Sequence, residues 1–130
     1  MDTIQESAAV FLNLTNHASA DWSDAQREAA EAYGRIVDLP FPAVSPQASA
    51  ADIRALAETI TDRAAALRPR AVLCQGEFTC CFAVVRRLLA RGIPVCAATS
   101  ERQSEEIVQP DGSTKKLSTF RFVQFRFYEG

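Results

Sequence analysis

The sequence predicts an α/β fold, a Rossmann-like parallel sheet with helices on both faces and a C-terminal β-hairpin. Short apolar runs at residues 8–14, 35–39, 71–74 and 93–99 have the pattern of strands buried in a parallel sheet. Amphipathic segments alternate with these runs, as expected for a doubly wound sheet.

Three helices are predicted between and after the strands. The first spans residues 23–34 and begins with a capping-box pattern, and the second spans 49–67 and is stopped by Pro69. The third follows the strand at 71–74 and ends before Gly92. Apolar residues at helical spacing define the predicted buried face of this third helix, namely Phe78, Phe82, Val85, Leu88 and Leu89.

The C-terminal part of the chain predicts a β-hairpin. Residues 107–109 form one arm, Pro110–Ser113 form the turn, and a run from Lys115 to Tyr128 forms the other arm. The last run places phenylalanines on both faces of a strand near the sheet edge. An exposed aromatic edge strand is prone to aggregate unless another surface packs against it. We therefore expect a homodimer through the sheet edge or the hairpin.

Composition narrows the class of protein. The chain has 130 residues, 48% of them hydrophobic, which predicts one folded domain spanning residues 1–130. A net charge of −2 disfavours binding to duplex nucleic acid, and no apolar run is long enough to cross a membrane. We therefore expect a cytoplasmic protein that does not bind membranes. The cysteines lack the spacing of a metal or redox motif and are expected to be buried thiols: Cys74, Cys80, Cys81 and Cys96.

Three polar segments follow predicted strands, at residues 13–17, 75–79 and 99–102. Ligands of open parallel sheets bind beyond the carboxyl ends of the strands, so these segments form the candidate site. The expected ligand-binding residues are Asn13, Thr15, Asn16, Gln75, Gly76, Glu77, Thr79, Thr99, Ser100 and Glu101.

Two residues are candidates for catalysis. His17 is the only histidine, and a histidine side chain can act as a general acid or base near neutral pH, although such a residue also serves as a structural hydrogen bonder. Arg102 can clamp a phosphate, and a surface salt bridge to a neighbouring glutamate is an equally good interpretation.

The loop after the third strand can bind an anion. Gly76 allows close approach of the backbone, and the following helix presents unpaired amides. Glu77 either stabilises the first turn of that helix or contacts ribose hydroxyls. The segment lacks a dinucleotide or P-loop motif, so no cofactor and no metal are expected.

Taken together, the three segments resemble those of the small CRISPR-associated Rossmann-like (CARF) proteins, which include the ring nucleases that cleave cyclic oligoadenylate. The resemblance is carried by Asn13–Ser19, by the strand-glycine-helix unit Leu73–Thr79, and by Thr99–Arg102. It covers most of the chain at the level of architecture.

This resemblance implies a single CARF-like domain that forms a homodimer and binds a cyclic RNA messenger of antiviral signalling across its two-fold axis. Cleavage in that family needs no metal, because the ribose 2′-hydroxyl attacks its own phosphate. His17 and Arg102 would then orient the ribose and stabilise negative charge. Two alternatives stay open: a non-catalytic sensor or sponge for the nucleotide, and a small protein-interaction module.

Overall fold

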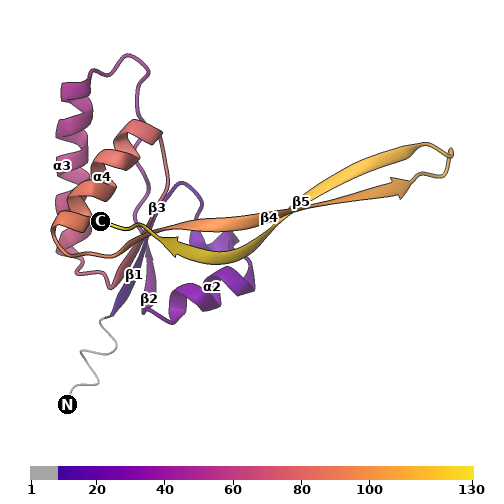
Figure 1. The fold of residues 1–130 in the computed structure, drawn as a ribbon, viewed down its shortest axis with the longest axis horizontal. Coiled ribbons are helices and arrows are strands. Elements are labelled where there is room, and N and C mark those ends of the chain that lie inside the picture. Colours follow the sequence, from indigo (N-terminus) through magenta and orange to yellow (C-terminus); the bar gives the residue numbers. More distant parts are fainter. Residues whose placement is uncertain (1–8) are drawn as a thin grey trace.

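The computed structural model of the protein describes residues 9–130, which form an α/β fold around one five-stranded sheet (Figure 1). The strand order is β2-β1-β3-β4-β5. The strands are β1 (Val10–Leu14), β2 (Arg35–Asp38), β3 (Ala71–Cys74), β4 (Val95–Val108) and β5 (Thr114–Phe127). The helical elements are the 3₁₀ turn η1 (Ser19–Asp21), α2 (Asp24–Glu31), α3 (Ala50–Ala66) and α4 (Phe78–Ala90).

The first four strands run parallel, which confirms the predicted α/β class. β1 is an inner strand that pairs with both β2 and β3, and all of its residues are buried. Successive side chains of β1 alternate between the two faces of the sheet: Phe11 packs into one core cluster and Leu12 into the other. The predicted start of this strand at Ala8 lies outside the described residues.

Helices cover both faces of the sheet. α2 packs on the face that carries Phe11, while α3 and α4 pack together on the opposite face. Serine caps begin two of these helices as the sequence predicts: Ser23 accepts a hydrogen bond from the amide of Gln26, and Ser49 forms a full capping box with Asp52. Within the described residues, no helix has the length and apolar character required to cross a membrane.

The C-terminal hairpin is longer than predicted. β4 and β5 pair antiparallel from Cys96 opposite Phe127 to Val108 opposite Thr114, and together they project far from the body of the molecule (Figure 1). The predicted loop at Thr99–Arg102 is therefore wrong, because these residues lie inside β4. Because their side chains are polar, these residues do not show the apolar pattern of a strand in the sequence. They are held in an extended strand by their pairing with β5.

A bulge places the phenylalanines of β5 on one face of the hairpin. The pairing shifts between Thr99 and Ser100, so Val123 has no partner across the ladder. The expectation that the phenylalanines lie on both faces of β5 is wrong for this reason. Their partners are alternate residues of β4, which share one face, and the aromatic side chains on this face are Phe120, Phe122, Phe125 and Phe127.

Part of the predicted buried face of α4 is also exposed. Phe78 and Phe82 are 90% and 69% exposed, respectively, although Val85 and Leu88 are buried as expected. The residues of α4 that face the core are Cys80, Cys81, Val84, Val85 and Leu88. Helical spacing identified an apolar stripe correctly, but it could not tell which of two stripes meets the sheet.

Candidate functional site

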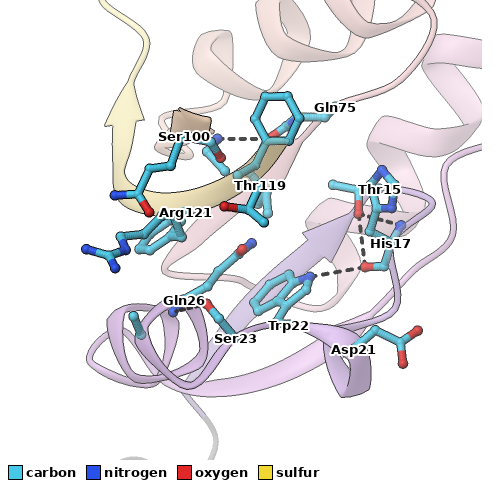
Figure 2. A pocket seen from close by; sticks show the side chains of 16 residues that line it. Thr15, His17, Asp21, Trp22, Ser23, Gln26, Gln75, Ser100, Thr119 and Arg121 are labelled. Atoms are coloured by element: carbon cyan, nitrogen blue, oxygen red, sulfur yellow. Dashed lines mark hydrogen bonds between the residues drawn. The ribbon is translucent and has the colours of Figure 1, made fainter. Parts of the chain in front are cut away.

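A crevice of about 910 Å³ opens beside the carboxyl ends of β1 and β3. One wall is the turn after β1 together with the start of α2, and the other is the base of the hairpin (Figure 2). The residues that line it are Thr15, His17, Asp21, Trp22, Ser23, Ala25, Gln26, Leu73, Gln75, Ala98, Ser100, Gln103, Thr119, Phe120, Arg121 and Phe122. Four of the residues predicted from sequence are among them: Thr15, His17, Gln75 and Ser100.

The turn after β1 is held by the side chain of Asn13. This side chain is only 1% exposed, and its Nδ2 donates to the backbone oxygen of His17 at 2.9 Å and to Oδ1 of Asp38 at 3.0 Å. Its Oδ1 accepts from the hydroxyl of Thr15 at 2.8 Å. The other carboxylate oxygen of Asp38 accepts from the amide of Ser19. Asn13 therefore connects the ends of β1 and β2 to the turn and positions it.

The backbone of His17 is fixed while its imidazole is exposed to the crevice. Its carbonyl oxygen accepts from Asn13 and from Nε1 of Trp22 at 3.2 Å. The same oxygen lies 3.3 Å from the hydroxyl of Thr15, whose single proton is donated at shorter distance to Asn13. Its amide donates to Oγ1 of Thr15 at 3.1 Å. Figure 2 shows the imidazole and the indole of Trp22 on the same wall. Asn16, in contrast, is exposed and does not line the crevice.

Gln75 and Gly76 have different positions relative to the crevice. The Oε1 atom of Gln75 accepts from the amide of Ala98 at 2.8 Å, where β4 leaves its pairing with β3, and this side chain lines the crevice. Gly76 is approached by the buried ring of Phe41, and a Cβ atom at this position would lie 2.3 Å from that ring. In this structure the group that approaches Gly76 closely is therefore the ring of Phe41.

Glu77 caps α4. Its Oε1 accepts from the hydroxyl of Thr79 at 2.6 Å and from the amide of Cys80 at 2.8 Å. These two hydrogen bonds, that of Thr79 above all, lower the pKa of the Glu77 carboxyl. Glu77 and Thr79 border a smaller hollow of about 310 Å³ beside Val44, not the main crevice. The helix-stabilising role considered for Glu77 is therefore confirmed.

The polar segment of β4 is held by hydrogen bonds across the hairpin. Thr99 donates to the backbone oxygen of Gln124 at 3.1 Å, and Arg102 donates to Oγ of Ser118 at 3.1 Å. Glu101 lies opposite Arg121 in the ladder. Thr99, Glu101 and Arg102 do not line the crevice.

Arg121 and three aromatic side chains line the crevice without being predicted as site residues. Trp22 directly follows the 3₁₀ turn η1, and Phe120 and Phe122 come from β5. Trp22 is the only tryptophan, and its place shortly after the predicted loop is a signal that could have identified it. No comparable local signal identifies β5, because only the bulge and the long pairing with β4 bring its residues to the crevice.

Two thiols are in contact between the end of β3 and α4. The Sγ atoms of Cys74 and Cys81 are 3.7 Å apart, and all four cysteines are buried and free, as predicted. Hydrogen bonding from the Cys74 thiol lowers the pKa of Cys81 to about 7, while the same contact and burial raise the pKa of Cys74. Cys81 is consequently the more acidic thiol of this pair.

The fold and the crevice define a small α/β protein with a mixed aromatic and polar site beside the carboxyl ends of its central strands. The chain belongs to a family described as the uncharacterized protein MJ1673 family, whose model matches residues 9–126. No curated protein and no solved structure matches the chain.

Proposed function

We propose that the domain is Rossmann-like and that its crevice binds cyclic oligoadenylate and cleaves it without a metal ion. The strand order reverses direction between β1 and β3, and the crevice lies beside the carboxyl ends of these strands. Nucleotides bind at this switch point in doubly wound sheets. The choice of ligand rests on the resemblance to the CARF proteins, of whose segments Thr15, His17, Gln75 and Ser100 line the crevice.

The single observation that carries the proposal is the combination of aromatic, cationic and polar side chains in one crevice. Trp22, Phe120 and Phe122 offer flat surfaces on which exposed bases of a single-stranded nucleotide can stack. Arg121 lies beside them and can pair with phosphate oxygens. The volume of about 910 Å³ is near the upper end of small-molecule sites, which favours an oligonucleotide over a mononucleotide.

The proposed reaction is an internal transesterification. His17 accepts the proton of a ribose 2′-hydroxyl, whose oxygen forms a bond to the adjacent phosphorus atom. The bond from phosphorus to the 5′-oxygen breaks, and the proton is returned to that oxygen. The product is a linear oligoadenylate with a 2′,3′-cyclic phosphate, and the fixed backbone of His17 supplies the orientation that in-line attack requires.

The test is incubation of the protein with cyclic tetra-adenylate and cyclic hexa-adenylate, followed by chromatography of the products. We expect linear products from the wild type and none from His17→Ala. Tight binding without turnover in both proteins would establish the alternative, a sensor or sponge. Absence of both binding and turnover would refute the proposal.

A pair of arginine variants tests the geometry of the crevice. Arg121 lines the crevice, whereas Arg102 donates to Ser118 on the same hairpin. We expect Arg121→Ala to weaken binding of the cyclic nucleotide about tenfold, since a charge-assisted hydrogen bond is lost. A larger loss in Arg102→Ala would place the phosphate at the segment predicted from sequence.

A further inference from the structure

α4 carries two apolar stripes, of which one is completely buried and the other is buried only at Val85 and partly at Leu89. Cys80, Val84 and Leu88 recur every four residues and are completely buried. The second stripe consists of Phe78, Phe82, Val85 and Leu89, which recur every three or four residues and therefore share a neighbouring face of the helix. A helix that is apolar on both faces is expected to be covered on both.

The second stripe is uncovered at its phenylalanines. Phe78 is 90% exposed, Phe82 is 69% exposed, and Tyr128 beside them is 45% exposed. Together with Val85, Leu89 and the C-terminal residues, they surround a hollow of about 520 Å³. We propose that this surface, the α4 face, is where a second copy of the chain docks about a two-fold axis.

The charges at the border of the α4 face favour a second copy over a different partner. Arg86 and Glu129 both line the hollow, and neither forms an ion pair with another described residue. In a two-fold interface the same surface is present on both sides, so Arg86 of one protomer can meet Glu129 of its partner, and the reverse. A surface that carries an apolar centre and both charges is complementary to itself.

The two exposed phenylalanines supply a large part of the area that a dimer needs. A phenylalanine side chain contributes about 150–250 Å² when it is buried, so Phe78 and Phe82 at their observed exposure supply ~300 Å² per copy. Two copies double this value to ~600 Å². Tyr128, Leu89 and the charged border raise it toward the ~1,000 Å² that a specific interface should exceed.

The α4 face is separate from the crevice, because no residue lines both cavities. The proposed contact differs from both dimers expected from the sequence: it does not use the sheet edge or the hairpin, and its two-fold axis does not pass through the ligand. It can therefore form whatever ligand occupies the crevice. Association can be measured without nucleotide, so failure here and failure of the proposed function are distinguishable.

The test is sedimentation equilibrium of the full chain at micromolar concentrations without added ligand. We expect a particle of twice the chain mass of 14.2 kDa for the wild type and a monomer for Phe82→Glu. The matched control is Val108→Glu on the hairpin, which adds the same charge at a residue that is 72% exposed and should leave the dimer intact. A monomeric wild type, or a dimer disrupted by Val108→Glu and not by Phe82→Glu, would overturn the proposal.

A charge exchange tests the two-fold arrangement itself. Arg86→Glu should weaken the dimer about tenfold by placing two carboxylates together, and Glu129→Arg should do the same with two cations. The double variant Arg86→Glu/Glu129→Arg should restore it. These exposed substitutions leave the core intact, so circular dichroism should be unchanged. Weakening that the double variant fails to reverse would exclude this pairing.

Discussion

Replacing Asn13 by alanine should destabilise the protein strongly, although this residue lies beneath the crevice and not in it. The substitution removes hydrogen bonds to His17, to Asp38 and from Thr15, each of which contributes about 1 kcal/mol net. A hydrogen bond to a charged group usually contributes more than this. The bond to the Asp38 carboxylate is given the same contribution as the other two, because Asp38 is exposed to solvent. We therefore expect the free energy of unfolding to fall by about 3 kcal/mol for Asn13→Ala.

Urea denaturation followed by tryptophan fluorescence measures this loss. Trp22 is the only tryptophan and donates to the carbonyl of His17, so its emission reports on the same turn. The matched control is Asn16→Ala, an exposed residue in that turn, which should change stability by less than about 0.5 kcal/mol. A loss below about 1 kcal/mol in Asn13→Ala would show that Asn13 does not hold the turn.

Three further predictions concern the neighbouring residues. Gly76→Ala should cost about 2 kcal/mol in thermal or urea unfolding, since its Cβ would clash with Phe41, and an unchanged stability would contradict this packing. Phe120→Ala should weaken binding of cyclic tetra-adenylate by about 1–3 kcal/mol in isothermal titration calorimetry, and equal affinity would show that no base stacks there. Iodoacetamide should alkylate Cys81 before Cys74, with a rate that rises through about pH 7 as the thiolate forms, and mass spectrometry that finds Cys74 modified first would refute this order.

The fold was largely predictable because its central strands are short, apolar and completely buried. The runs that form β1 and β3 are too short and too uniformly apolar to resemble an amphipathic helix. Serine caps marked the starts of two helices. The length of β4 was not predictable, since its outer half is polar and extended only through pairing with β5.

The candidate site was predictable on one wall only. Residues such as Thr15, His17 and Gln75 follow buried strands, and the sheet topology necessarily brings the ends of those strands together. The opposite wall depends on the bulge at Val123, which turns Phe120 and Phe122 toward the face that carries Phe125 and Phe127. A pairing irregularity between distant strands leaves no local mark in the sequence.

The central claim is that the crevice, and no other surface, receives a cyclic oligoadenylate. Chemical-shift mapping of the ¹⁵N-labelled protein during titration with cyclic tetra-adenylate tests it most directly. We expect the largest changes at the indole N–H of Trp22 and at the amides of Gln75, Ser100 and Arg121, which line the crevice. Changes confined to α4 (Phe78–Ala90), or none at saturating ligand, would contradict the claim.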